Sequence, residues 1–269
     1  MYRSPLSSLW VEKAPVSLLR PLAGAVLMAL SGMGSLQAGE LEFLGAHGNA
    51  ASGAGFGGAS SLAVSPDNKY IYVAAAIDHG LGLFKRDIDG QPSYLNFYPA
   101  AADLGSNDLP VKVLVTADGT NLYAAFKSFD KGRVALYHRN TGNGELTFYK
   151  SYDGLGDVAD FAISGDGKNL YLSGMNSIVV YERDIATGEL KNVETKIDGQ
   201  SGVDGIAGGS GLTLTADGKY LFVAGAVDNA LAIFTRSTTT GRLGFVEALR
   251  NDPSKGVIGL AGARSGVES

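Results

Sequence analysis

The stretch Ser65-Pro-Asp-Asn-Lys-Tyr-Ile-Tyr-Val-Ala74 decides the fold, because its pattern occurs three more times along the chain. The other copies are Thr116-Ala-Asp-Gly-Thr-Asn-Leu-Tyr-Ala-Ala125, Ser164-Gly-Asp-Gly-Lys-Asn-Leu-Tyr-Leu-Ser173 and Thr215-Ala-Asp-Gly-Lys-Tyr-Leu-Phe-Val-Ala224. Their shared aspartates are spaced by 51, 48 and 51 residues: Asp67, Asp118, Asp166 and Asp217. Aspartate can accept a hydrogen bond from the backbone two residues on, and the Asn or Gly after it tolerates positive φ. Each copy therefore predicts a tight hairpin turn followed by a strand.

Each copy belongs to a longer repeating unit. An apolar strand precedes the turn, and a third strand ends in an aromatic residue, a polar residue and arginine: Arg86, Arg139, Arg183 and Arg236. A second turn with Asp-Gly or Thr-Gly then leads into a fourth strand. Four antiparallel strands in about fifty residues are typical of a β-propeller blade, whereas a β-sandwich does not require the same turn four times. We therefore predict an all-β propeller with four complete blades at about 59–98, 110–150, 158–197 and 210–249.

The flanks of the four blades resemble single strands of the repeat. Glu40-Leu-Glu-Phe-Leu44 is similar to the fourth strand at Glu145-Leu-Thr-Phe-Tyr149, which predicts an N-terminal outer strand that completes the last blade. Gly256-Val-Ile-Gly-Leu-Ala-Gly-Ala-Arg264 is similar to the start of a first strand, which predicts a partial C-terminal blade. We expect a propeller domain over 39–264, with a truncation point in the tail 265–269, or else a small five-bladed ring.

The first 38 residues carry the features of a secretory signal. Arg3, Lys13 and Arg20 precede a short apolar run at 21–30, and small residues lead to Ala38, after which we expect cleavage. The alternative, a membrane anchor, is less favoured because the apolar run is too short to span a bilayer comfortably. The sequence thus predicts an exported protein, periplasmic or extracellular, that is not integral to the membrane after cleavage.

Composition narrows the class of protein further. The chain contains 38 Gly and no Cys among 269 residues, so it can form neither a disulfide nor a Cys-ligated metal site. Its formal net charge is −5 and its Lys and Arg residues do not cluster, which argues against a nucleic-acid partner. The partner that remains is a small molecule or a protein.

The repeat resembles the YVTN-type and lactonase-type β-propeller repeat. The motifs that carry this resemblance are Ser-Pro-Asp-Asn-Lys-Tyr-Ile-Tyr-Val at 65–73, Thr-Ala-Asp-Gly-Lys-Tyr-Leu-Phe-Val at 215–223 and Arg-x-x-x-Thr-Gly-x-Leu at 183–190 and 236–243. Proteins of this kind are often described as 6-phosphogluconolactonase-like. The resemblance implies the propeller fold and, as a possible activity, ring-opening of a sugar lactone.

Candidate site residues lie in the loops that face the mouth of a propeller channel, namely those between second and third strands and those between blades. Asp78, His79 and Asp228 are the candidate catalytic residues, because carboxylates and an imidazole could polarise a carbonyl or activate water. The candidate ligand-binding residues are Asp130, Asn229 and Arg264. The structural alternative is that the Asp and Asn residues cap hairpin turns, which the repetition of Ile77-Asp78-His79 as Val227-Asp228-Asn229 favours.

The sequence predicts no cofactor, although Ca²⁺ is not excluded. The loops Asp153-Gly-Leu-Gly-Asp157 and Asp198-Gly-Gln-Ser-Gly-Val-Asp-Gly205 could offer oxygen ligands to Ca²⁺, but neither has EF-hand spacing. Gly53-Ala-Gly-Phe-Gly-Gly58 matches the dinucleotide fingerprint only formally, because it precedes a strand instead of a helix. Two functions follow as hypotheses, a binding propeller without chemistry and a lactone hydrolase, and a purely structural surface protein is a third.

Overall fold

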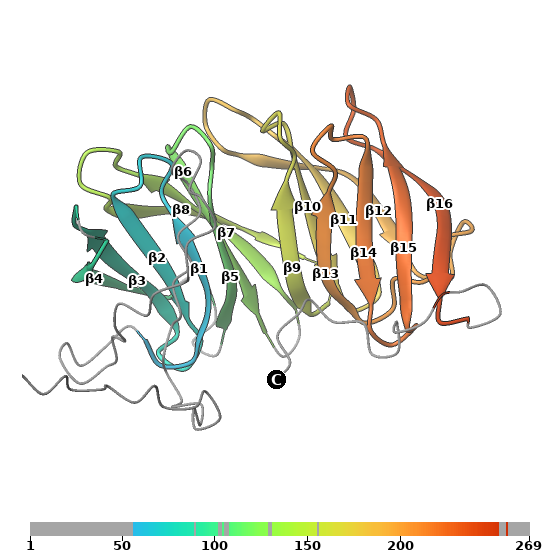
Figure 1. The fold of residues 1–269 in the computed structure, drawn as a ribbon, viewed down its shortest axis with the longest axis horizontal. Coiled ribbons are helices and arrows are strands. Elements are labelled where there is room, and N and C mark those ends of the chain that lie inside the picture. The colour runs from blue at the N-terminus through green and yellow to red at the C-terminus, as the bar shows by residue number, and fades with distance from the viewer. Residues whose placement is uncertain are drawn as a thin grey trace, which may run out of the picture.

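The structure of the chain is a computed structural model that describes residues 56–88, 90–101, 104, 108–128, 131–154, 156–252 and 257. The described residues form β-strands, turns and irregular segments, with no helix among them (Figure 1). Within this part of the chain there is accordingly no helix long and apolar enough to cross a membrane.

The strands form four antiparallel sheets of four strands each, in chain order. The first sheet consists of β1 (Ala59–Val64), β2 (Tyr70–Ala75), β3 (Gly80–Arg86) and β4 (Pro92–Pro99). The second consists of β5 (Leu109–Val115), β6 (Asn121–Lys127), β7 (Arg133–Arg139) and β8 (Leu146–Asp153). The third consists of β9 (Val158–Ile163), β10 (Asn169–Gly174), β11 (Ser177–Arg183) and β12 (Leu190–Ile197). The fourth consists of β13 (Gly209–Leu214), β14 (Tyr220–Gly225), β15 (Ala230–Arg236) and β16 (Leu243–Arg250).

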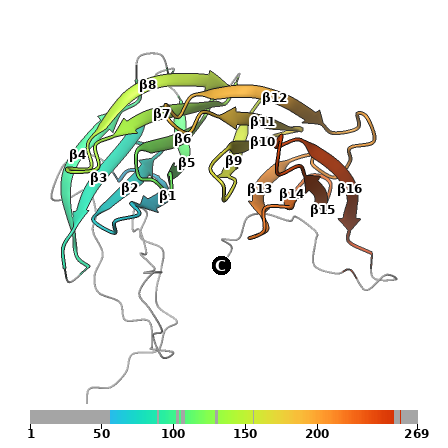
Figure 2. The same ribbon diagram turned by 90° about the horizontal axis from the view of Figure 1, so that it is seen from above.

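The four sheets stand side by side in an arc, as propeller blades do. Figure 2 shows the first strands β1, β5, β9 and β13 on the inner side of the arc and the last strands β4, β8, β12 and β16 on the outer side. The predicted all-β class with four-stranded antiparallel blades is confirmed. The predicted signal segment, the N-terminal outer strand and, apart from Val257, the partial C-terminal blade lie outside the described residues.

The predicted turn chemistry is present between the first and second strands. Asp67 Oδ1 accepts hydrogen bonds from the Ser65 hydroxyl and from the Lys69 N–H, and Asn68 between them has a φ of 58°. Glycine occupies the position of Asn68 in the other sheets, with φ of 73°, 72° and 67°: Gly119, Gly167 and Gly218. A side chain is rarely tolerated at such φ, which explains the Asn or Gly after each repeated aspartate.

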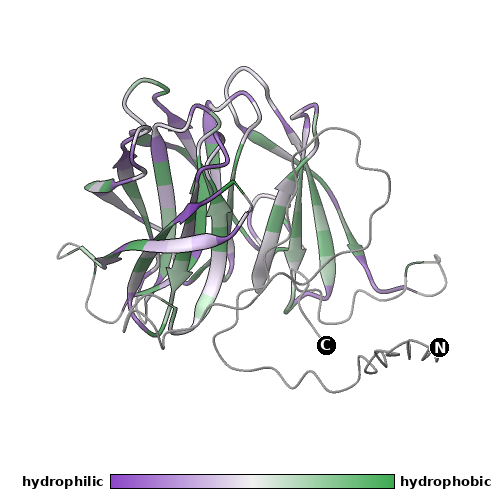
Figure 3. Ribbon diagram, turned by 60° about the vertical axis from the view of Figure 1, so that its left-hand side comes forward, coloured by the Kyte–Doolittle hydropathy of each residue, from purple (hydrophilic) through white to green (hydrophobic). Residues whose placement is uncertain are grey.

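The hydrophobic core lies between neighbouring sheets. Tyr72 and Leu83 of the first sheet, for example, pack against Val113 and Leu122 of the second, and all four are buried. Equivalent clusters join the second sheet to the third and the third to the fourth. In Figure 3 the hydrophobic colour is accordingly concentrated on strands, although some strands are pale or purple, and many of the loops are hydrophilic.

A buried polar contact, which we call the inter-sheet latch, accompanies each of these cores. The Tyr72 hydroxyl donates to the Gly144 carbonyl (2.7 Å) and accepts a hydrogen bond from Arg139 Nε (2.6 Å) in the next sheet. Arg139 Nη1 also donates to the Gly119 carbonyl of its own sheet (2.8 Å). The same contacts recur at the following two interfaces with Tyr123 and Arg183, and with Tyr171 and Arg236. In the second, third and fourth sheets, the arginine that ends the third strand therefore fastens its sheet to the preceding one.

Candidate functional site

The loops in which the sequence places candidate site residues lie together at one end of the sheets. In an antiparallel sheet the first strand begins where the second strand ends, so the turn after each second strand lies beside the segment that enters each first strand. These turns and segments follow the lower edge of the sheets in Figure 1. We call this end of the inner strands the mouth, and define it by the turns 76–79, 175–176 and 226–229 and the segments 56–58, 156–157 and 198–208.

Asp78 and Asp228 both hold backbone at the mouth. Asp78 Oδ2 accepts hydrogen bonds from the N–H groups of Phe56 (3.0 Å) and Gly57 (2.8 Å), which lead into β1. Asp228 Oδ2 accepts a hydrogen bond from the Ala207 N–H (2.9 Å), just before β13. Each carboxylate thus ties the turn after a second strand to the segment entering the first strand of the same sheet. These bonds give both carboxylates a structural role, but they reach a neighbouring segment, whereas the sequence predicted caps within the hairpin turns themselves.

His79 and Asn229 occupy equivalent turn positions with left-handed backbone, at φ of 52° and 51°. The Nδ1 atom of half-buried His79 lies 3.4 Å from the Asp108 carbonyl oxygen, at the start of the second sheet. The Asn229 amide faces the Val227 carbonyl oxygen (3.4 Å) within its own turn. His79 follows β2 and Asn229 follows β14, so the structure places them at opposite ends of the arc (Figure 2).

Two candidate ligand-binding residues, Asp130 and Arg264, lie outside the described residues.

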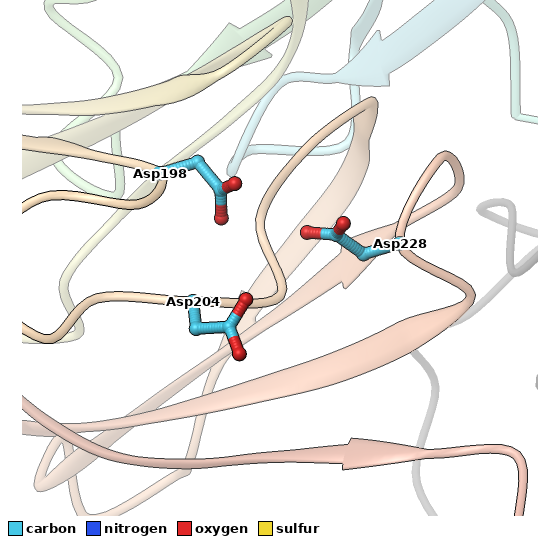
Figure 4. A group of neighbouring side chains, drawn as sticks. All are labelled: Asp198, Asp204 and Asp228. Carbon is cyan, nitrogen blue, oxygen red and sulfur yellow. The ribbon is translucent and has the colours of Figure 1, made fainter.

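The mouth brings together three carboxylates from two separate segments of the chain. Asp198 and Asp204 come from the segment between β12 and β13, and Asp228 comes from the turn after β14. One oxygen of each lies within 4.8 Å of the others, and Figure 4 shows the three side chains directed toward the same space. The sequence predicted the loop of Asp198 as a possible source of Ca²⁺ ligands and Asp228 as a catalytic residue. It did not indicate that these side chains lie close together.

Two contacts offset the charge of this acidic cluster. Arg250, at the end of β16, donates two hydrogen bonds to the Asp204 carboxylate (2.8 and 2.6 Å), and this contact holds the pKa of Asp204 below its ordinary value. Asp198 Oδ1 accepts a hydrogen bond from the Ile206 N–H (3.1 Å). Carboxylate oxygens are the ligands that Ca²⁺ prefers, so the cluster could hold such an ion. Its present contacts already stabilise the segment 198–208 without one.

A hollow of about 290 Å³ opens beside this segment, between the inner strands of the second, third and fourth sheets. Its lining residues are Val111, Lys127, Asp157, Val158, Ala159, Met175, Gly208, Gly209 and Ser210. The wall is mostly apolar, and its charged groups are Lys127 and Asp157, which form an ion pair at 2.8 Å. In the sequence Asp157 stands out only as a loop residue with carboxylate oxygens, and no motif marks Lys127, because its ion-pair partner is 30 residues away.

Comparison with known proteins decides the family. The family model described as "Lactonase, 7-bladed beta-propeller" matches residues 35–157, 97–205 and 150–257. The chain belongs to this seven-bladed lactonase family. The match covers all four sheets, as the resemblance of the repeats predicted.

Relatives of this lactonase-family chain carry one recurrent name. A protein of Buchnera aphidicola named 6-phosphogluconolactonase is 32% identical over 88 residues, which is 32% of this chain and 26% of that protein. Two crystal structures are of provisionally named 6-phosphogluconolactonases. The one from Bacteroides uniformis is 22% identical, with a TM-score of 0.62 over 72% of this chain and 55% of its own. The one from Bacteroides fragilis is 21% identical, with a TM-score of 0.58 over 71% and 54%. The chain spans only about a quarter to a half of the length of these three relatives. Because the two structures are less than 25% identical to it, they establish the fold alone.

Proposed function

We propose that this lactonase-family chain is an exported module that binds a small molecule at its mouth. The observation that carries the proposal is the hollow between the inner strands of three sheets, which combines apolar walls with one cation and one carboxylate. Ligand sites in proteins commonly combine these features, a concave and mostly apolar surface with a few polar groups. The basic and apolar pattern of residues 1–38 supports export.

The positions of the candidate catalytic residues favour binding over catalysis. Asp78 and Asp228 accept backbone hydrogen bonds, and His79 contacts a backbone carbonyl in another sheet. A general base acts within hydrogen-bond reach of the proton that it removes. Carboxylates already occupied in holding loops are better suited to shaping a site than to proton transfer.

A blocking substitution tests the proposal. The full chain is screened against small polar metabolites by ligand-observed NMR, and each hit is measured again with Ala159→Phe, which fills the hollow from its wall. The matched control is Ala186→Phe, an exposed turn position that lies at the opposite end of the sheets. We expect hits to lose binding with Ala159→Phe and to keep it with Ala186→Phe. Hits that bind both variants equally would refute binding in the hollow.

Lactone hydrolysis is a second candidate function, favoured by the name that several relatives share. The purified chain is assayed against sugar lactones with correction for spontaneous hydrolysis, beside His79→Ala and the matched turn variant Asn229→Ala. Turnover that disappears only with His79→Ala would establish an enzyme and displace the binding-only proposal. No turnover across the panel would leave hydrolysis without support.

A further inference from the structure

Three turns at the mouth present large apolar side chains to solvent, and we call these side chains the apolar tips. Ile77 follows β2, Met175 follows β10 and Val227 follows β14, and their exposed fractions are 72%, 56% and 71%. In the described part of the chain only Ile88 is a more exposed large apolar residue. Turns favour Gly, Pro, Asn, Asp and Ser, and exposed apolar residues are ordinarily scattered singly. Three of them at the corresponding turn of three sheets form a repeated pattern that scattered exposure does not explain.

The backbone holds the apolar tips in place. The Ile77 N–H donates to the Gly57 carbonyl at 2.8 Å. Two glycines leave room for the tips, because a Cβ atom on Gly58 would lie 2.8 Å from Ile77 Cγ1. A Cβ atom on Gly208 would likewise lie 2.6 Å from Val227 Cγ2. A surface that is ordered before binding loses less conformational entropy when a partner contacts it. The apolar tips are therefore prepared for contact with another molecule.

The turns of two apolar tips lie next to each other and to the acidic cluster. The Gly208 N–H donates to the Met175 carbonyl, and the Gly208 carbonyl accepts a hydrogen bond from the Ala226 N–H at 3.0 Å. The turn that begins at Ala226 continues through Val227 into Asp228, which belongs to the acidic cluster (Figure 4). Apolar surface and negative charge are therefore adjacent at the mouth of the third and fourth sheets.

The charge of the mouth selects the kind of partner. The residues that define the mouth include no Lys or Arg but five carboxylates: Asp78, Asp157, Asp198, Asp204 and Asp228. Lys127 and Arg250 lie beside the mouth and pair with Asp157 (2.8 Å) and Asp204 (2.6 Å). The described residues thus leave the mouth with a negative charge. Such a surface attracts a positively charged partner and repels the anionic surface of a membrane.

We propose that the apolar tips and the carboxylates around them form a docking surface for a basic segment of another protein, in which Lys or Arg residues alternate with large apolar residues. The alternation matches the mouth, where a carboxylate directly follows an apolar tip at Ile77-Asp78 and at Val227-Asp228. Apolar side chains of the segment pack on the tips, and its cations lie beside the carboxylates. This interaction goes beyond the proposed function and does not require a ligand in the hollow.

Three synthetic peptides of equal length separate the apolar and the charged contribution. One alternates Lys with Leu, the second alternates Lys with Ser, and the third alternates Glu with Leu. Binding of each fluorescent peptide to the full chain is measured by anisotropy at two salt concentrations. Since one leucine buried on a tip contributes roughly a factor of ten, we expect the Lys–Leu peptide to bind at least about tenfold more tightly than the Lys–Ser peptide. The Glu–Leu peptide should be repelled, and added salt should weaken the Lys–Leu peptide.

A double variant locates the binding at the apolar tips. Met175→Ser combined with Val227→Ser should weaken the Lys–Leu peptide about tenfold or more and leave the Lys–Ser peptide nearly unchanged. The matched control combines Ile88→Ser with Ile185→Ser, which removes two exposed isoleucines from turns at the opposite end of the sheets. This control should bind the Lys–Leu peptide as the unaltered chain does.

A charge variant tests the acidic contribution separately. Asp198→Asn keeps a side-chain oxygen that can accept the hydrogen bond from the Ile206 N–H, now 3.1 Å long, but removes the negative charge. It should weaken the Lys–Leu peptide and reduce the effect of salt on its affinity. This variant keeps the test decisive if the double variant does not fold.

Three results would overturn the docking surface. The first is equal affinity for the Lys–Leu and Lys–Ser peptides, or no binding of either. The second is unchanged binding of the Lys–Leu peptide by the folded double variant. The third is binding to vesicles of phosphatidylcholine and phosphatidylserine that depends on the apolar tips, which would identify a membrane contact instead. The proposed function is decided separately, by the metabolite screen with Ala159→Phe.

Discussion

Removing one hydroxyl from the inter-sheet latch tests how the sheets are held together. Tyr123→Phe keeps the buried ring but deletes the group that donates to the Gly188 carbonyl and accepts from Arg183 Nε at 2.9 Å. Tyr123 is fully buried and Arg183 is 4% exposed, so water cannot replace the lost partner. The Gly188 carbonyl and the Arg183 Nε–H group then stay buried without the hydrogen bonds that they made to this hydroxyl. We therefore expect the free energy of unfolding to fall by about 3 kcal/mol. For a chain of this size that corresponds to a lower melting temperature by about 6–12 °C.

The fourth sheet contains a natural control for this experiment. Phe222 in β14 occupies the position that tyrosine holds in the first three sheets, and no following sheet is described beside it. Phe222→Tyr therefore adds the same hydroxyl without a latch to complete, and stability should stay nearly unchanged. Urea unfolding of both variants and the unaltered chain, with the denaturant slope compared, provides the measurement. A loss below about 1 kcal/mol for Tyr123→Phe would refute the reasoning, because it would show that the hydroxyl contributes no more than a solvent-exposed group.

Three further predictions concern pH, packing and charge. Burial raises the pKa of Tyr123 to about 12, from 10.0 in the unfolded chain. The stability that this protonated hydroxyl contributes is therefore complete below pH 10 and is lost as the pH rises toward 12. In Tyr123→Phe the loss of stability at alkaline pH, followed by circular dichroism, should be smaller. Gly209→Ala should destabilise by about 1–3 kcal/mol because its Cβ would meet the third sheet, whereas Gly165→Ala, with no neighbour within 4 Å, should be nearly neutral in thermal unfolding. Arg250→Met should strengthen Ca²⁺ binding in calorimetric titration by freeing the Asp204 carboxylate, and unchanged affinity would show that the acidic cluster is not a cation site.

The predicted catalytic and binding residues show how much of the site can be inferred from residues that are close in sequence. The repetition of Asp78 as Asp228 indicated equivalent positions, and both residues lie in the turn after a second strand. From residues close in sequence we predicted that the two side chains cap these turns. The segment that each aspartate holds is about twenty residues away, however, and the sequence did not identify it. Asp130 and Arg264 remain predictions, since the structure does not describe them.

The sequence by itself determined the repeating unit, its four strands and its turns. Asp67 and Asn68 form their turn through bonds that span two residues, and such local chemistry is readable at each copy of the motif. Only the tertiary structure decided which distant groups meet. Tyr72 and Arg139 are 67 residues apart, and Lys127 meets Asp157 across two sheets. These contacts depend on the angle and spacing at which successive sheets pack, and packing between faces leaves no pattern within a single strand.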